Sequence, residues 1–112
     1  MNKLKIGICG WGNVATGLYK TILDNQKEIE SNSNIKLEIV VIGARRDNPK
    51  CDPQNIIIER DIFNVLNHEI DVLVELIGGV EVARELILKS IEKGINVVTA
   101  NKAVLYLSLI HI

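Results

Sequence analysis

The stretch LKIGICGWGNVA, residues 4–15, decides the fold of this chain. Its first six residues form an apolar run of strand length, and Gly10, Trp11 and Gly12 then form a glycine-rich turn. From Val14 onward, apolar residues recur every three to four positions, which predicts a helix to about residue 29. A strand that passes through a tight turn into a helix begins a β-α-β unit.

The rest of the chain continues this alternation. After a polar break at residues 31–34, strands are predicted at residues 35–44, 56–58, 71–77 and 95–99, and helices at residues 61–67, 81–93 and from Asn101 onward. Asp61 is placed to cap one helix and Gly94 to end another. The predicted buried side of helix 81–93 comprises Val82, Leu86, Ile87 and Ile91. This alternation predicts an α/β fold, a doubly wound, mostly parallel sheet of the Rossmann type with strands buried on both faces.

The turn at residues 10–15 has the pattern G-x-G-x-x-A, which suits a pyrophosphate. Gly10 allows the tight turn, Gly12 has no side chain to block the anion, and Ala15 lets the helix pack closely on the sheet. The N–H groups of Asn13 and Val14 open the helix and point at the anion, assisted by the helix dipole. A turn without a ligand is the alternative. The position after the first strand favours dinucleotide binding.

Two arginines follow the second strand, where NAD enzymes usually carry an acidic residue. Arg45 and Arg46 suit an adenosine 2′-phosphate, because the planar guanidinium matches phosphate oxygens. Asp47 is expected to offset part of their charge. A pair of solvated arginines is the alternative. NADP is therefore the preferred cofactor, and NAD stays possible.

Further candidate residues follow the fourth and fifth strands. Gly78 and Gly79 would let a cofactor approach the backbone, although a simple turn also explains them. Glu75 lies in an apolar strand and needs a partner, which makes it a candidate support of the site, unless it lies at a sheet edge. In the segment Thr99-Ala100-Asn101-Lys102, the lysine is placed to donate to a carbonyl oxygen or to relay a proton. A solvated lysine at a helix start is its alternative.

Composition excludes several other classes of function. The net charge is −1 without a basic run, which argues against nucleic acid and membrane surfaces as partners. The apolar runs are of strand length, and no signal peptide is recognisable, so we expect a cytoplasmic protein. Cys9 and Cys51 have no metal-ligand spacing; we expect free thiols and no metal site.

Three segments together resemble the signatures of homoserine dehydrogenase: GICGWGNV at residues 7–14, VELIGG at 74–79 and VVTANKA at 97–103. The resemblance extends to about Leu105. It implies NAD(P)-dependent interconversion of L-aspartate 4-semialdehyde and L-homoserine, in the pathway to threonine, methionine and isoleucine. Trp11 stands where the family more often has a smaller apolar residue, and Ala15 replaces the usual third glycine.

The resemblance also implies roles for individual residues. Lys102 would be one of a pair of catalytic lysines beside the nicotinamide, and Glu75 would help build that region. The cofactor-binding residues would be Gly10, Trp11, Gly12, Asn13, Val14, Arg45, Arg46, Gly78, Gly79, Thr99, Ala100, Asn101 and Lys102.

The expected domain organisation is that of a truncated protein. Residues 1–106 would be a partial dinucleotide-binding domain, incomplete at its carboxyl end, and the substrate domain with its second lysine would be absent. Residues 107–112 do not resemble the family, but they do resemble one reading frame of a transposon-end sequencing adapter. We therefore expect a non-native tail. The resemblance implies that the full-length protein forms a homo-oligomer.

Two alternative functions remain open. One is a related reductase of amino-acid metabolism, of the aspartate dehydrogenase or dihydrodipicolinate reductase type, against which the segment at residues 99–102 argues. The other is a module that senses the dinucleotide without catalysis.

Overall fold

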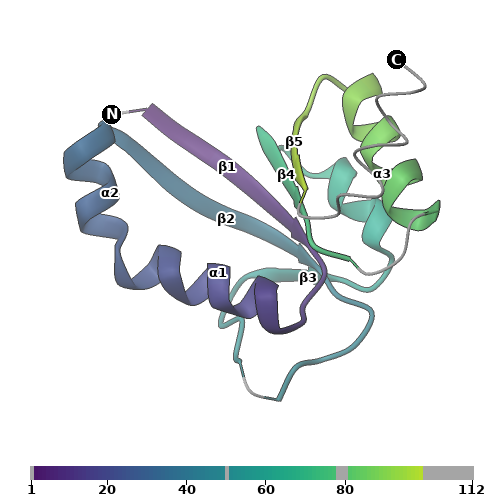
Figure 1. Cartoon of the computed structure of the whole chain (residues 1–112), viewed down its shortest axis with the longest axis horizontal. Helices are drawn as coiled ribbons and strands as arrows, with labels where there is room; N and C mark the ends of the chain where they lie inside the picture. The colour runs from purple at the N-terminus through teal and green to yellow at the C-terminus, as the bar shows by residue number, and fades with distance from the viewer. Residues whose placement is uncertain (1, 50, 78–80, 100–112) are drawn as a thin grey trace.

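The computed structural model describes residues 2–49, 51–77 and 81–99. In these residues, parallel strands form one sheet in the order β3-β2-β1-β4-β5 (Figure 1). The strands are β1 Asn2–Cys9, β2 Ile35–Gly43, β3 Ile57–Glu59, β4 Val72–Glu75 and β5 Asn96–Thr99. The helices are α1 Asn13–Asp24, α2 Gln26–Ser33, the 3₁₀ helix η1 Ile62–Asn67 and α3 Glu81–Glu92. The predicted doubly wound parallel sheet is confirmed.

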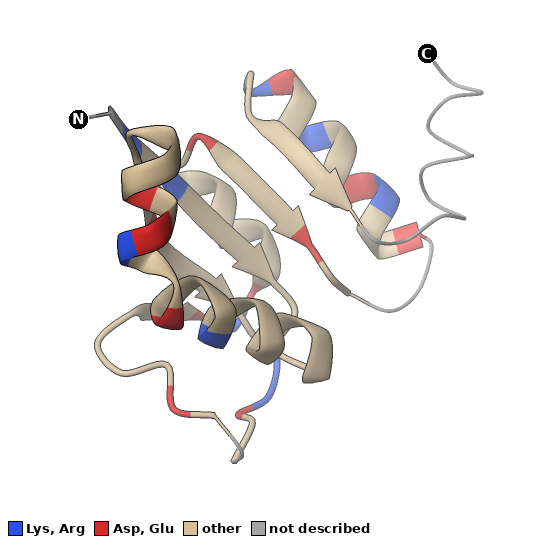
Figure 2. Cartoon of the chain, turned by 60° about the vertical axis from the view of Figure 1, so that its left-hand side comes forward, with Lys and Arg blue, Asp and Glu red and all other residues tan. Residues whose placement is uncertain are grey.

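Both faces of the sheet carry an apolar cluster, because successive strand residues point to opposite sides. Ile8 and Ile42 belong to the cluster under α1, whereas their neighbours Cys9 and Val41 belong to the cluster under η1 and α3. Charged residues lie mainly on the helices and loops (Figure 2). The central strands are therefore buried on both sides, as their apolar runs predict.

Glycines on the two central strands let η1 lie close to the sheet. A Cβ atom on Gly7 would lie 2.8 Å from Cγ1 of Val65 and 2.9 Å from Cδ1 of Ile70. A Cβ on Gly43 would lie 2.9 Å from Cγ2 of the same valine. Any side chain at these positions would push η1 away from β1 and β2.

The single helix predicted for residues 14–29 is wrong: the structure has two helices that meet at Asn25. The side chain of Asn25 donates to the Thr21 carbonyl at 2.8 Å, and its backbone N–H donates to the same oxygen at 3.1 Å. This local bonding ends α1. The predicted polar break at residues 31–34 is also mostly wrong, because α2 continues to Ser33 and ends at Asn34, which has a φ of 56°.

Other predicted boundaries differ by small amounts. Strand β4 is shorter than the predicted 71–77. The predicted cap at Asp61 is confirmed, since its carboxylate accepts from the Phe63 N–H at 3.1 Å, although the helix it caps is of the 3₁₀ type. Gly94 follows α3 with a φ of 76° and also fits its predicted role. Within the described residues, no helix combines the length and apolarity needed to cross a bilayer.

Three apolar residues are more exposed than expected. Val14, Ile91 and Val98 are 66%, 52% and 57% exposed. The buried residues of α3 are Ala83, Leu86, Ile87 and Ser90. Leu86 and Ile87 are therefore buried as predicted, together with the small residues Ala83 and Ser90, whereas Ile91 is left outside. The helix predicted from Asn101 lies outside the described residues.

The surroundings of Gly7 and Gly17 predict opposite effects on the free energy of unfolding when each glycine is replaced by alanine. Gly7→Ala should lower the free energy of unfolding by about 1–3 kcal/mol, because the added methyl group overpacks Val65 and Ile70. Gly17→Ala, in the middle of α1 with no atom within 4 Å of its Cβ position, should raise it by about 0.5–1 kcal/mol. Urea denaturation measures both. A Gly7→Ala variant as stable as the original chain would contradict this account of the packing.

Candidate functional site

The glycine turn lies where the carboxyl ends of β1, β2 and β4 meet. The N–H of Gly10 donates to the Gly43 carbonyl at the end of β2, at 2.8 Å. On its other side, a Cβ on Gly10 would lie 2.9 Å from the Leu76 carbonyl oxygen, just beyond β4. The φ of Gly10 is 104°, a value that disfavours other residues. Glycine is thus required here both by the backbone conformation and by the lack of space.

The start of α1 is open to an anion. Gly12 is the N-cap residue, and neither a capping side chain nor an acidic residue occurs in the first turn. A Cβ on Gly12 would meet no atom within 4 Å, and its φ of −94° is one that any residue adopts. The fold itself therefore does not require this glycine. It keeps free the space in front of the first amides of the helix, including those of Asn13 and Val14, which have no partner within the helix.

The arginines and the glycine turn share one pocket. Its volume is about 400 Å³, and it is lined by Gly10, Trp11, Gly12, Gly43, Arg45, Arg46, Ile62, Leu76 and Ile77. Arg45 and Arg46 are exposed, and they come from the loop after β2, more than thirty residues away from the turn in sequence. The sheet thus brings together the residues predicted to bind a pyrophosphate and those predicted to bind a 2′-phosphate.

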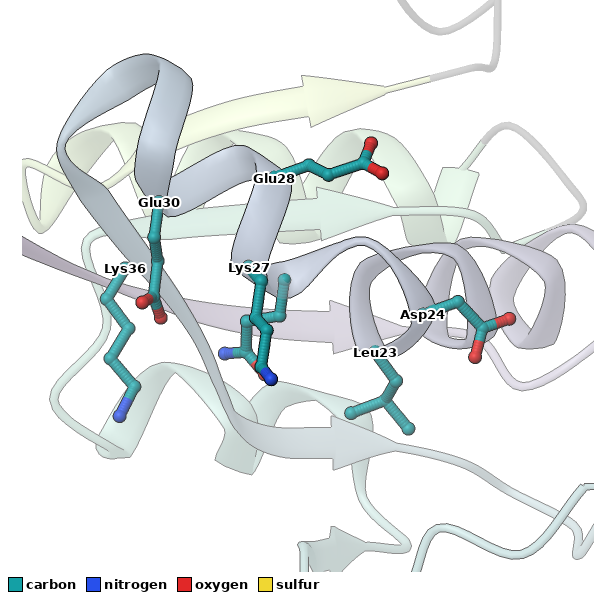
Figure 3. Close-up of a pocket in the computed structure, with 7 residues that line it drawn as sticks. Leu23, Asp24, Lys27, Glu28, Glu30 and Lys36 are labelled. Atoms are coloured by element: carbon teal, nitrogen blue, oxygen red, sulfur yellow. The ribbon is translucent and has the colours of Figure 1, made fainter.

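A larger pocket of about 590 Å³ lies elsewhere, where α1 meets α2 (Figure 3). Basic residues Lys27 and Lys36 alternate there with Asp24, Glu28 and Glu30. This mixture of charges provides no concentrated positive field for an anion. The pocket also lies far from the carboxyl ends of the strands, where α/β sheets bind ligands. We therefore assign the site to the smaller pocket.

The acidic neighbour of the two arginines has another partner. Asp47 was expected to offset the charge of Arg45 and Arg46, but it forms an ion pair with Arg60 instead. Arg60 also donates to the Ala44 carbonyl at 3.2 Å. The expectation for Asp47 is therefore corrected. Sequence reasoning missed Arg60, although its position just after β3 places it at the same edge of the sheet.

Glu75 is fully buried at the carboxyl end of β4, and both of its oxygens are used. One oxygen accepts from the Ile77 N–H at 2.9 Å, and the other accepts from the Thr99 hydroxyl at the end of β5. These bonds offset the cost of burying a carboxylate and join the ends of β4 and β5. Its role in supporting the site stays a prediction, because Gly78, Gly79 and residues 100–102 lie outside the described residues.

Cys9 lies under the glycine turn and is fully buried. Burial raises the pKa of its thiol to about 12, and the neighbouring charge of Glu75 adds to this shift. The thiol donates to the Ile62 carbonyl at 3.7 Å. Cys9 is thus an uncharged packing residue, and both Cys9 and Cys51 are free thiols, as predicted. No group of three metal-ligating side chains occurs in residues 2–49, 51–77 and 81–99.

Comparison with known proteins identifies the family. Residues 10–110 match the family described as homoserine dehydrogenase, NAD binding domain. The chain belongs to this family. The resemblance carried by the three sequence signatures is therefore confirmed, and a nicotinamide dinucleotide is supported as the cofactor.

Curated relatives agree with this assignment. The homoserine dehydrogenase of Pseudomonas aeruginosa is 50% identical over 106 residues, an alignment that covers 94% of this chain and 24% of that protein. That of Methylobacillus glycogenes is 39% identical over 110 residues, covering 94% of this chain and 26% of that protein. The chain therefore spans about a quarter of the length of these relatives.

Solved structures show the same fold. A homoserine dehydrogenase from Thiobacillus denitrificans superimposes with a TM-score of 0.83 at 33% identity, covering 92% of this chain and 24% of that one. The enzyme from Staphylococcus aureus gives a TM-score of 0.80 at 30% identity, covering 90% of this chain and 26% of that one. The Rossmann-type arrangement is thus shared with homoserine dehydrogenases of known structure.

The environment of Cys9 predicts an unreactive thiol. In a Cys51→Ala variant, where Cys9 is the remaining cysteine, alkylation by iodoacetamide at pH 8 should be about a thousandfold slower than for a free thiol. A raised pKa leaves less thiolate at that pH, and burial slows the reaction further. Mass spectrometry measures the rate, and addition of urea provides the control, since unfolding should restore normal reactivity. Rapid alkylation without urea would contradict the assigned environment.

Proposed function

We propose that the protein carrying this chain is a homoserine dehydrogenase, an NAD(P)-dependent oxidoreductase that acts on a CH–OH group. It would interconvert L-aspartate 4-semialdehyde and L-homoserine, and this chain would supply its cofactor-binding part. The observation that carries the proposal is the uncapped start of α1 beside Arg45 and Arg46, in a chain of this family. The homo-oligomer implied by the resemblance stays a prediction.

We assign the two ends of the cofactor to different residues of the pocket. The amides of Asn13 and Val14 would bind the pyrophosphate, since the helix start presents N–H groups and a positive dipole. Arg45 and Arg46 would bind the adenosine 2′-phosphate, which favours NADP over NAD. The pairing of Asp47 with Arg60 supports this preference, because the acidic residue that follows the two arginines in the sequence is engaged with another cation.

The catalytic step would depend on Lys102, which lies outside the described residues. The bound dinucleotide would supply the hydride-transfer chemistry at the terminal carbon of the substrate. Lys102 would donate a proton to the substrate oxygen during reduction and accept that proton during oxidation. Glu75 and Thr99, bonded to each other across the ends of β4 and β5, would support that end of the site. Substrate binding would require the remainder of the protein.

A double Arg45→Ala/Arg46→Ala variant should bind NADPH about 10- to 100-fold more weakly, since charge-assisted hydrogen bonds to the 2′-phosphate are lost. Its affinity for NADH, which has no such phosphate, should stay within about twofold. Trp11, the single tryptophan, lines the same pocket and provides a fluorescence signal for the titration of the unaltered chain and the variant.

The matched control is Lys27→Ala/Lys36→Ala, which removes the same number of charges at the pocket shown in Figure 3. It should leave both affinities unchanged apart from a small general electrostatic effect. Equal weakening of NADPH and NADH in the arginine variant would contradict the assignment of these residues to the 2′-phosphate.

Lys102→Ala in the longer protein should lower homoserine turnover by about 10²- to 10⁴-fold, because the proton at the substrate oxygen loses its carrier. NADPH affinity should change little. Steady-state rates and nucleotide titrations measure the two effects, and Lys89→Ala on α3 is the control, since Lys89 pairs with Glu85 on that helix. Unchanged turnover would contradict this role of Lys102, whereas nucleotide binding without any homoserine turnover in the unaltered longer protein would favour a dinucleotide-sensing module. We expect the 112-residue chain alone to oxidise no homoserine.

A further inference from the structure

The loop that carries the two arginines is long and has no regular secondary structure. We call residues 44–56 the arginine loop; the structure describes all of them except residue 50. A guanidinium on a mobile loop loses conformational entropy when it binds a phosphate, and this loss weakens binding. A loop already fixed in the binding position avoids the loss. The contacts of the arginine loop with the glycine turn therefore bear directly on phosphate binding.

One contact is apolar and is centred on Trp11. This side chain is only 8% exposed, and its ring meets that of Tyr19 edge to face, with centroids 5.4 Å apart and an interplanar angle of 72°. Ala44 and Cys51, from the arginine loop, are buried in the same cluster. Burial raises the pKa of Tyr19, and its neighbours Cys51 and Asp52 add to the shift. The loop therefore packs against the rings of Trp11 and Tyr19.

A second contact is polar and joins the same two segments. The side-chain amide of Asn48 donates to the Trp11 carbonyl at 3.2 Å, in the middle of the glycine turn. The Asn48 carbonyl in turn accepts from the Cys51 N–H at 3.1 Å, which closes a turn within the loop. Asn48 lies two residues after Arg46. The backbone that carries the arginines is thus tied to the backbone that faces the pyrophosphate.

We infer that Trp11 and Asn48 are positioning residues that determine the preference for a dinucleotide with a phosphomonoester on its adenosine ribose. They hold the arginine loop against the glycine turn, so that Arg45 and Arg46 are ordered before the ligand arrives. The inference rests on the proposed function, in which these arginines bind the 2′-phosphate. The sequence predicts Trp11 as a cofactor-binding residue. In this inference its side chain instead packs under the arginine loop, while its backbone remains part of the glycine turn.

Two variants loosen the loop in different ways. Asn48→Ala removes the hydrogen bond to the turn, and Trp11→Leu removes the ring while keeping an apolar side chain. Each should weaken NADPH binding about three- to tenfold, a range set by the loss of one hydrogen bond or of part of an aromatic contact. The loss should be larger for NADPH than for NADH, because NADH has no 2′-phosphate for the arginines to bind. Calorimetric titration measures both affinities.

Gln26→Ala is the matched control. Gln26 also donates from a side-chain amide to a backbone carbonyl, that of Leu37 at 2.9 Å, but it does so at the start of α2. Its loss should change neither affinity. Hydrogen exchange provides a readout without nucleotide: amides of the arginine loop should exchange faster in Asn48→Ala and Trp11→Leu than in the original chain or in Gln26→Ala.

Faster exchange in the loop together with selective loss of NADPH affinity would support the inference. Unchanged exchange, or equal loss of NADPH and NADH affinity, would overturn it. An unaltered chain that binds neither nucleotide would instead contradict the proposed function. In that case the exchange rates still decide whether Trp11 and Asn48 hold the loop.

Discussion

The close approach of Gly10 to the chain beyond β4 is the constraint on which the site depends. Its N–H is bonded to the end of β2, and there is no space for a side chain beside the Leu76 carbonyl. The ends of three strands are therefore joined at one residue. Because β1 ends at this point, α1 begins between the ends of β2 and β4. The first amides of α1 therefore face outward. Any residue that widened this contact would move the start of the helix away from the pocket.

Close packing below the sheet complements this constraint. Gly7 and Gly43 let η1 approach β1 and β2, and the Cys9 thiol fills the space between the sheet and the Ile62 carbonyl. Helix η1 thus packs against one face of β1 and β2, and the carboxyl ends of these two strands lie beside the pocket. Burial and the neighbouring Glu75 raise the pKa of the Cys9 thiol, which therefore stays protonated. A buried thiolate there would repel the carboxylate that joins β4 to β5.

Much of this architecture could be predicted from the sequence, because its signals are local. The succession of strands and helices along the chain follows from alternating periodicities, and the glycine turn and the Asp61 cap are short motifs. What could not be predicted depends on contacts distant in sequence or on which of two adjacent helix faces is buried. Periodicity correctly predicts Leu86 and Ile87 as buried, but the small residues Ala83 and Ser90 are buried as well, and Ile91 is not. The Asp47–Arg60 ion pair could not be predicted, because it depends on the register of β2 with β3, in which Gly43 lies opposite Glu59.

The same register helps to explain why two separate sets of contacts lie along the carboxyl edge of the sheet. On the side of β2 and β3, Arg60 is bonded to Asp47 and to the Ala44 carbonyl, which leaves Arg45 and Arg46 exposed beside the glycine turn. On the side of β4 and β5, the bonds of Glu75 to Ile77 and Thr99 hold the strand ends together. These two sets of contacts share no residue. The proposed nucleotide preference and the proposed support of the reactive end can therefore change independently, because a substitution in the arginine loop leaves the bonds between β4 and β5 intact.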